Sequence, residues 1–325
     1  MLTCDFCGNT DTIDSEAFQI DTVNPGFWCE LCQGYSYLEE DAERHRFTLI
    51  LEDKHADNVQ FVAPIVSLSK RISPYRYPGG KSKIIDFLYT HLQKNKTQKL
   101  ISPFTGGGSF ELSLLAAGVV DRLHLNDLDF GVYALWWIIK HMPYALIDLV
   151  QNKEPDHKTF FEAQSIIKND YRGTDLVDAA WYSLIVNRLA FSGIAKANPL
   201  GGKKGTKESL LSRWNPGELI RRIEKIHSMS DRIEITQENA VNLIEESYWE
   251  DDSTIFIDPP YVNKGKQLYP CYYTEKDHRD LCFLLDTLHF EFPGADIITT
   301  YDYNEWIQNL YKYPDVKVIG RTYSI

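Results

Sequence analysis

The chain has 325 residues, which suits one large domain with an insertion, or two domains. Hydrophobic residues make up 43% of it and aromatic residues 13%, enough for a sizeable core, so an intrinsically disordered protein is excluded. The net charge of −12 is unevenly distributed, because residues 1–60 hold 13 acidic and 3 basic side chains, whereas segments 64–100 and 186–225 are basic. An acidic arm beside two basic segments fits a localised phosphate-binding surface.

Four cysteines near the N-terminus have the spacing of zinc ligands. Cys4 and Cys7 form one Cys-x-x-Cys pair, and Cys29 and Cys32 form a second. Four thiolates make the tetrahedral set that structural zinc prefers, and protein then fills every coordination position. We therefore expect a structural zinc ribbon within residues 1–60. Unmetallated cysteines and a redox pair are the alternatives.

The compartment follows from what the sequence lacks. No apolar run approaches the roughly 18 residues of a membrane span. The N-terminus has no basic region followed by an apolar stretch, so we expect no signal peptide. We therefore expect a cytoplasmic protein that does not enter the membrane and keeps its cysteines reduced.

Residues 41–70 are mixed in character. Within them, Phe47 to Leu51 fits either a strand or the end of a helix. We interpret this part as the junction between the ribbon and the main domain, which we expect to run from residue 61 to residue 325.

A first glycine turn follows in the run Tyr-Pro-Gly-Gly-Lys, which ends at Lys81. Two adjacent glycines let the backbone approach a ligand closely, and Ser82 is a candidate cap for a helix over residues 83–91. A lysine beside a helix N-terminus makes an anion site, here suited to a carboxylate. An exposed turn with lysines is the plainer alternative.

A second glycine turn lies between an expected strand and an expected helix. Leu100 and Ile101 are apolar, Gly106 to Gly108 form the turn, and helical spacing continues over 109–117. Strand, glycine loop and helix make the first half of a doubly wound nucleotide-binding unit. The next strand ends at Asp127, and its distance of about 20 residues from the loop suits a carboxylate that binds ribose hydroxyls.

A long basic segment interrupts the regular pattern. Residues 129–190 show apolar residues at helical spacing, but from residue 187 to Trp214 glycine, proline and lysine dominate. Long ordered loops are usually functional, whereas a disordered surface insert is the alternative. We treat 186–225 as one basic insert.

Strands and helices alternate after this insert. We expect helices over 216–227, 240–246, 277–289 and 306–311, and strands over 232–236, 253–257, 296–300 and 316–320. This alternation predicts a mainly parallel, doubly wound α/β sheet.

The strand over 253–257 ends abruptly at Asp258. Pro259 and Pro260 cannot continue the pairing, and Tyr261 follows them. An acid, a fixed backbone carbonyl and an aromatic ring thus lie at the carboxyl end of a strand, where open α/β sheets bind ligands. A simple strand end with a proline turn is the alternative.

The order of these motifs resembles the Dam-type, or D12 class, family of N6-adenine DNA methyltransferases. The resemblance covers roughly residues 70–325 and rests on Tyr-Pro-Gly-Gly-Lys, Phe-Thr-Gly-Gly-Gly-Ser, Asn-Asp-Leu-Asp, Asn-Arg-x-x-Phe-Ser-Gly and Asp-Pro-Pro-Tyr. The zinc ribbon lies outside it. The family usually continues into a Glu-Leu-Leu-like strand, whereas this chain stops at Tyr323-Ser324-Ile325.

The resemblance implies a Rossmann-like methyltransferase sheet that uses S-adenosylmethionine, with 186–225 as the target-recognition insert. It implies that Lys81 faces the methionine carboxylate of this cofactor and that Asp127 binds its ribose. The full set of implied cofactor-binding residues is Tyr77, Gly80, Lys81, Phe104, Gly106, Gly108 and Asp127.

The same resemblance assigns catalysis to Asp258, Pro259, Pro260 and Tyr261. The exocyclic amine of adenine is a poor nucleophile, because its lone pair is delocalised into the ring. Asp258 and the Pro259 carbonyl would accept its two N–H groups, with the prolines fixing the geometry in advance. Tyr261 would stack on a base extruded from the duplex. Cytosine-N4 enzymes more often begin this motif with serine, so Asp258 favours adenine.

Double-stranded DNA is the expected partner, and the oligomeric state is not predicted. Arginine and lysine contact phosphates and guanine edges, so the candidate DNA contacts are Arg188, Phe191, Lys196, Lys203, Lys204 and Arg213. Two other functions compete: a DNA-binding module with an inactive methylase domain, and an RNA or protein methyltransferase. The intact Asp258, Tyr261 and Asp127 argue against the first, and resemblance to a DNA family argues against the second.

Overall fold

The computed structural model describes residues 45–56, 61, 64–77, 79–93, 96–262 and 271–320, together with five short strands before residue 38. Those five strands are β1 (Leu2–Thr3), β2 (Thr10–Asp11), β3 (Phe18–Asp21), β4 (Gly26–Cys29) and β5 (Gly34–Tyr37). The strands of the main sheet are β6 (Phe47–Asp53), β7 (Lys99–Ser102), β8 (Arg122–Asn126), β9 (Ile233–Thr236), β10 (Ser253–Ile257), β11 (Asp296–Asp302) and β12 (Asp315–Gly320).

Helices connect these strands along the chain. The α-helices are α1 (Ile85–Tyr89), α2 (Ser109–Ala116), α3 (Phe130–His141), α4 (Pro143–Asn152), α5 (His157–Lys168), α6 (Leu176–Leu189), α7 (Lys207–Leu210), α8 (Pro216–His227), α9 (Ala240–Ser247), α11 (Glu275–Glu291) and α12 (Glu305–Leu310). Four short 3-10 turns are η1 (Lys81–Lys83), η2 (Phe191–Gly193), η3 (Leu211–Arg213) and η4 (Ser230–Arg232).

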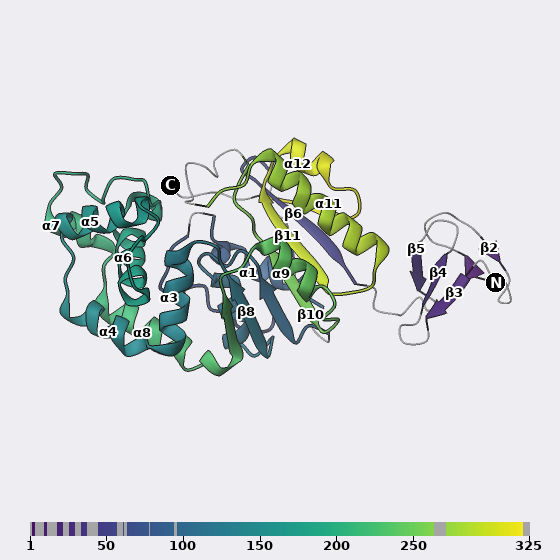
Figure 1. Ribbon diagram of the computed structural model, residues 1–325, viewed down its shortest axis with the longest axis horizontal. Coiled ribbons are helices and arrows are strands. Elements are labelled where there is room, and N and C mark those ends of the chain that lie inside the picture. Colours follow the sequence, from purple (N-terminus) through teal and green to yellow (C-terminus); the bar gives the residue numbers. More distant parts are fainter. Residues whose placement is uncertain are drawn as a thin grey trace.

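A seven-stranded sheet forms the centre of the molecule, in the order β12-β6-β11-β10-β7-β8-β9 (Figure 1). Every neighbouring pair in it is parallel. The predicted parallel α/β sheet is therefore confirmed. In a parallel sheet all carboxyl ends lie at one edge, so the loops after β7, β8, β9 and β10 meet there.

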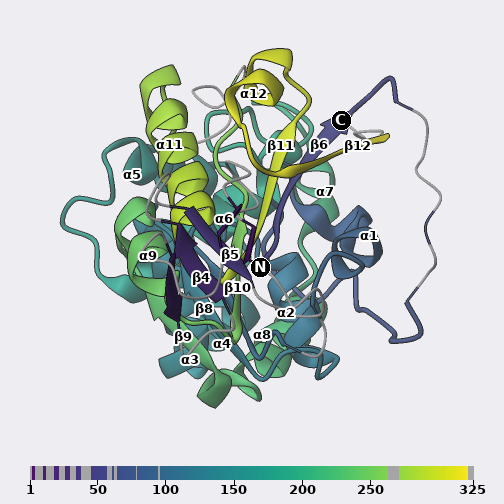
Figure 2. The same ribbon diagram turned by 90° about the vertical axis from the view of Figure 1, so that its right-hand side faces the viewer.

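Alternating side chains bury both faces of this sheet. On β6, Ile50 belongs to one apolar cluster, with α1, α2 and α3, whereas Leu49 and Leu51 belong to a second, with α9 and α11. Strand β10 does the same, because Phe256 and Ile255 point to opposite clusters. Figure 2 shows α9 and α11 on one side of the sheet and α1 on the other. Successive strand residues face opposite ways, so an apolar run without polar gaps is what two covered faces require.

Strand β6 belongs to the main sheet, although it precedes residue 61, where we expected the main domain to begin. Its seven residues pair in parallel with β11 on one side and β12 on the other, so they form an inner strand of the main sheet. The sequence left this segment open between strand and helix, because Phe47 to Leu51 is short and apolar in either case. Pairing with β11 and β12, some 250 residues away in the chain, makes this segment a strand.

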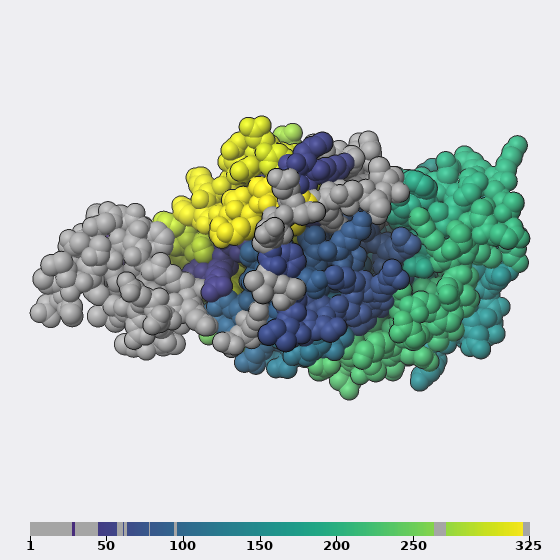
Figure 3. Space-filling view, turned by 180° about the vertical axis from the view of Figure 1, so that it is seen from behind, coloured from purple at the N-terminus to yellow at the C-terminus, as the bar shows by residue number. Residues whose placement is uncertain are grey.

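The helices α3 to α8 form a lobe at one end of the molecule (Figures 1 and 3). Helix α8 spans 216–227 as predicted, since the Asn215 side chain accepts from Glu218 N–H and Pro216 occupies the first turn. The basic insert begins in α6, continues through η2, α7 and η3, and ends in α8. It is an ordered part of this lobe, so the alternative of a disordered insert is wrong.

The helix after the first glycine turn is shorter than predicted. Lys81, Ser82 and Lys83 form the 3-10 turn η1, and α1 begins at Ile85. Neither η1 nor α1 has a side-chain cap, so the predicted capping role of Ser82 is wrong. Lys81 is therefore held by tertiary contacts and not by a helix N-terminus.

The N-terminal strands form two antiparallel sheets, β1-β2 and β3-β4-β5. Cys29 is buried at the end of β4, whereas Cys4, Cys7 and Cys32 lie outside the described residues. Trp28 contacts Phe292 with ring centroids 6.0 Å apart, so this part of the chain packs near the end of α11. Within the described residues no group of acidic, histidine and cysteine side chains has the arrangement of a metal site.

Membrane insertion was not expected from the sequence. Among the helices that the structure describes, none combines the length and apolar character that crossing a bilayer requires.

Candidate active site

A cavity of about 370 Å³ opens at the carboxyl edge of the sheet. This volume is in the range of pockets that bind small molecules. The predicted cofactor residues that line it are Tyr77, Gly80, Lys81, Phe104, Gly106, Gly108 and Asp127. Asp258 and Pro260 line the same cavity. The structure thus brings the two glycine turns, the acid after β8 and the motif after β10 to one place.

The second glycine turn has a backbone that glycine alone adopts easily. Gly106 and Gly108 have φ of +48° and +57°, in the left-handed region. A Cβ atom on Gly106 would lie 2.9 Å from the ring of Tyr77, so a larger residue would collide with the first glycine turn. The two turns therefore touch each other at the cavity wall.

Asn126 joins three strand ends beneath the cavity. Its side-chain Nδ2 donates to Pro103 O at 3.0 Å and to Glu238 O at 3.1 Å. Its Oδ1 accepts from Thr236 Oγ1 at 2.9 Å and from Glu238 N at 2.7 Å. All four hydrogen-bonding positions of this buried amide are used, which fixes the loops after β7, β8 and β9 relative to one another.

Asp127 is placed by these contacts at the cavity wall. Its carboxylate accepts from Gly106 N at 2.8 Å and from Asp129 N at 3.0 Å. Protein atoms surround the carboxylate although part of the residue faces the cavity, and this burial raises its pKa to about 7. The charge of Asp129 adds to the rise, and the two N–H donors oppose it. Asp127 therefore titrates close to neutral pH.

Asp258 follows β10 and is held on one oxygen. Its Oδ1 accepts from Lys81 Nζ at 2.6 Å and from Thr300 Oγ1 at 2.9 Å. Among the described residues, Oδ2 has no hydrogen-bond donor. One oxygen is thus committed to fixing the side chain, which leaves the other as the acceptor for a ligand.

Tyr261 packs against the first glycine turn. A Cβ atom on Gly79 would lie 2.0 Å from its hydroxyl, and Gly79 has φ of +80°. The ring lies 5.6 Å from Lys81 Nζ, a cation–π distance, and the residue is only 6% exposed. Its predicted stacking on an extruded base stays a prediction. Pro259 is buried.

Asn187 links the helical lobe to the active site. Its Oδ1 accepts from Arg76 N at 2.7 Å, and its Nδ2 donates to Arg76 O. Gly193 is equally constrained, because it has φ of +73° and a Cβ atom there would lie 3.0 Å from Arg76 O. The Asn-Arg-x-x-Phe-Ser-Gly motif therefore holds the irregular segment that leads into Tyr77.

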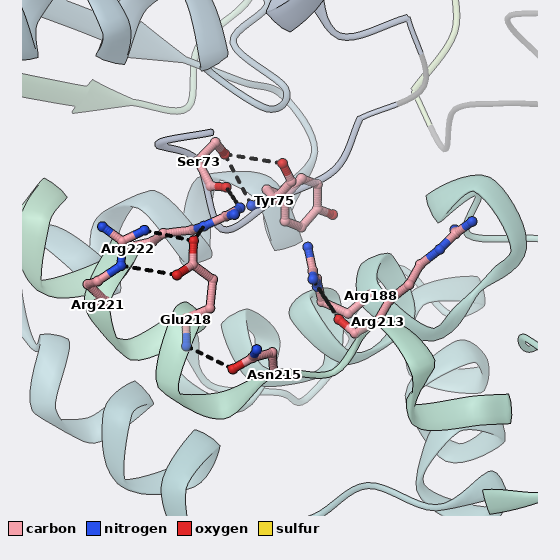
Figure 4. Close-up of polar contacts among 8 residues, drawn as sticks. All are labelled: Ser73, Tyr75, Arg188, Arg213, Asn215, Glu218, Arg221 and Arg222. Atoms are coloured by element: carbon pink, nitrogen blue, oxygen red, sulfur yellow. Dashed lines mark hydrogen bonds and ion pairs between the residues drawn. The ribbon is translucent and has the colours of Figure 1, made fainter. Parts of the chain in front are cut away.

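An arginine cluster lies where this lobe meets that segment, and Figure 4 shows all its members except Arg76. The cluster consists of Arg76, Arg188, Arg213, Arg221 and Arg222. The Arg188 side chain donates to Arg213 O from Nε at 3.1 Å and from Nη2 at 2.5 Å. Burial lowers the pKa of Arg188 to about 10, and the positive charges of Arg76, Arg222 and Arg213 add to the effect. Glu218 is shared by Arg221 and Arg222. Positive charge therefore exceeds negative charge in this cluster.

The other predicted DNA contacts lie between Arg188 and Arg213 in the chain. Phe191 is 49% exposed, and Lys196, Lys203 and Lys204 are also exposed. The structure brings Arg188 and Arg213 together, and it places the two adjacent lysines in the turn before α7.

Several residues of the site were not predicted. The cavity is also lined by Glu238, Asn239 and Ala240, which follow β9, and by Tyr272 and Tyr273. The rule that strand ends carry ligands would have found the first group, because β9 was predicted. Tyr272 and Tyr273 have no sequence signal, and Arg76 was overlooked although it immediately precedes Tyr77.

Comparisons with known proteins agree with this arrangement. Residues 77–325 match the family model of D12 class N6 adenine-specific DNA methyltransferases. The chain is similar to the type II methyltransferase M.MjaIII of Methanocaldococcus jannaschii, at 20% identity over 230 residues, which cover 64% of this chain and 76% of that protein. It is also similar to the type II methyltransferase M.CviBI of Paramecium bursaria Chlorella virus NC1A, at 22% identity over 204 residues, which cover 62% and 74%. The chain therefore belongs to the D12 class of S-adenosylmethionine-dependent, N6-adenine-specific DNA methyltransferases.

Proposed function

We propose that the cavity holds S-adenosylmethionine and that Asp258 orients the exocyclic amine of the target adenine beside it. The observation that carries this proposal is the convergence of Asp127, Lys81 and Asp258 on one cavity, from three distant parts of the chain. The two aspartates would have different roles. Asp127 would hold the cofactor, and Asp258 would hold the base.

The residues at the cavity suit the cofactor. The left-handed Gly106 and Gly108 keep side chains away from the wall, so a ligand approaches the backbone closely. The carboxylate of Asp127 is an acceptor for ribose hydroxyls, and Phe104 and Tyr77 offer apolar surface. When bound, S-adenosylmethionine supplies an electrophilic methyl group.

The geometry of Asp258 suits a group that activates an amine. Lys81 and Thr300 hold Oδ1, and Oδ2 is left to accept one N–H of the base. The Pro259 carbonyl would accept the other, and together they localise the lone pair of the nitrogen. Positive charge would develop on the nitrogen as its bond to the methyl group forms and the sulfur–methyl bond of the cofactor breaks. The nearby carboxylate would stabilise that charge until the nitrogen loses one proton.

The DNA would lie across the arginine cluster and the insert. Arg76, Arg188 and Arg213 provide positive charge close to the active site, and the exposed Lys203 and Lys204 extend it along the lobe. Both relatives are type II methyltransferases, so we propose that this protein likewise modifies adenine within a specific duplex sequence.

We propose a structural role for zinc at the N-terminus. The support is the pair of Cys-x-x-Cys motifs, together with short antiparallel strands and the position of Cys29 at the end of β4. Such a site would stabilise the arm and leave the chemistry to the cavity.

The exchange Asp258→Ala tests the catalytic assignment. We expect methyl transfer to fall by about 10²–10³-fold or more, because a preorganised acceptor at the reacting nitrogen is lost. Binding of S-adenosylmethionine, measured by calorimetry, should change little. Transfer is measured with labelled cofactor and unmethylated DNA, followed by mapping of the modified base. Near wild-type transfer would mean that Asp258 is not the group that activates the amine.

The raised pKa of Asp127 predicts that cofactor binding depends on pH. Below a pKa of about 7 the carboxyl is protonated and no longer accepts from two hydroxyls, so affinity should fall with pH. We expect the dissociation constant to rise about tenfold from pH 8 to pH 6 beyond any change in Asp127→Asn. Glu111, whose pKa burial also raises to about 7, lines the cavity, so Glu111→Gln is the matched control and should keep this dependence. An equal pH dependence in Asp127→Asn would contradict the assignment.

The arginine cluster predicts salt-dependent DNA binding. The double variant Arg76→Ala/Arg213→Ala should weaken binding and reduce the slope of log affinity against log salt by about two, since each phosphate contact contributes about 0.9. Fluorescence anisotropy at several salt concentrations measures both quantities. Lys276→Ala, an exposed cation on α11, is the control and should leave the slope unchanged. An unchanged affinity and an unchanged salt slope in the double variant would mean that DNA binds elsewhere on the protein.

The ribbon predicts about one zinc per chain with sulfur ligands. Elemental analysis of freshly purified protein measures the content, and X-ray absorption identifies the ligand atoms. Cys29→Ser should remove the metal while the main domain keeps its melting transition, because small ribbons depend on metal to fold. Full zinc content in Cys29→Ser would refute this ligand set.

A further inference from the structure

Glu52 brings a buried carboxylate to the active-site residue Lys81 from outside the part of the chain that matches the family. It is the second-last residue of β6, and its side chain is 0% exposed. Its Oε1 lies 3.0 Å from Lys81 Nζ. The family match spans residues 77–325 and does not include this strand, so it assigns Glu52 no role.

Three acceptors surround the ammonium of Lys81. Nζ lies 2.6 Å from Asp258 Oδ1, 3.0 Å from Glu52 Oε1 and 3.1 Å from Gly79 O. Gly79 O and Asp258 Oδ1 accept hydrogen bonds from Nζ, whereas Glu52 Oε1 forms an ion pair with it. Lys81 is only 3% exposed, so water cannot replace a lost partner. Removing one carboxylate would leave the buried ammonium of Lys81 with less compensating negative charge.

The sheet explains how Glu52 reaches this position. Strand β11 lies between β6 and β10, and Glu52 stands opposite Asp302 in its register. The same strand supplies Thr300, which donates to Asp258 Oδ1. Both groups that fix this oxygen therefore depend on the side of the sheet that β6 completes.

We propose that Glu52 is a positioning residue for methyl transfer, which acts on Asp258 through Lys81. It anchors the ammonium that holds Oδ1 and so keeps Oδ2 available to the amine. The inference rests on the proposed role of Asp258.

Glu52 also changes the charge of the site. Two ionised carboxylates around one ammonium leave a net negative charge, whereas Lys81 and Asp258 alone would form a neutral pair. Positive charge develops on the amine nitrogen in the transition state, and a net negative site stabilises it better than a neutral one. Glu52 thereby supplies electrostatic stabilisation without touching the substrate.

The exchange Glu52→Gln removes the charge and keeps the size of the side chain. We expect kcat at saturating cofactor and DNA to fall roughly 10- to 100-fold, by analogy with residues that orient metal ligands. The KM for S-adenosylmethionine and the affinity for DNA should stay within about twofold, since Glu52 contacts neither. Asp296→Asn is the matched control, because it neutralises another buried acid, bonded to Arg46 N and Gln93, and should keep kcat.

Two further variants separate this role from a purely structural one. Glu52→Asp keeps the charge on a shorter side chain, so it should retain more kcat than Glu52→Gln, whereas a packing role predicts the reverse order. In a double-mutant cycle with Lys81→Met, the Glu52→Gln loss should largely disappear, because both act through one ammonium.

Wild-type kcat in Glu52→Gln, lower kcat in Glu52→Asp than in Glu52→Gln, or additive losses in the cycle would overturn the proposal. The Asp258→Ala variant is measured alongside. If it is inactive while Glu52→Gln is unaffected, only the present inference fails. If Asp258→Ala is active, the proposed function fails as well.

Discussion

A single buried ammonium connects the segments on which the active site depends. Lys81 lies between Asp258, after β10, and Glu52, in β6, and is almost completely shielded from water. Burying an ion without a partner is costly, so these three side chains stabilise one another only in this arrangement. The turn that carries Lys81 is fixed further by Gly79, whose missing side chain makes room for Tyr261.

The two aspartates at the cavity are held by separate hydrogen-bond networks at the same sheet edge. Asn126 uses all its hydrogen bonds to tie the ends of β7, β8 and β9, and this network holds Asp127. Asp258 is instead held by Lys81 and Thr300. The hydrogen bonds that hold Asp127 and those that hold Asp258 therefore involve different residues, although both carboxylates face one cavity.

The helical lobe is joined to this edge through the backbone. Asn187 hydrogen-bonds both the N–H and the carbonyl of Arg76, one residue before Tyr77. The arginine cluster thus shares a segment with the cavity. If the proposed DNA contacts are made by these arginines, the DNA is held relative to the site of methyl transfer through this segment.

The sequence by itself determined the local elements and most of the cavity. Apolar runs and turn residues predicted the strands that carry Asp127 and Asp258, and Asn215 with Pro216 set the start of α8, because these signals act between near neighbours. The tertiary structure alone decided that β6 lies inside the main sheet, that Ser82 caps no helix, and that Lys81 meets Glu52 and Asp258. Nothing local distinguishes a strand from a helix at Phe47 to Leu51, and nothing near Glu52 in the chain indicates its partner. Strand pairing and burial of charge depend on residues far apart in sequence, so only the folded chain brings them together.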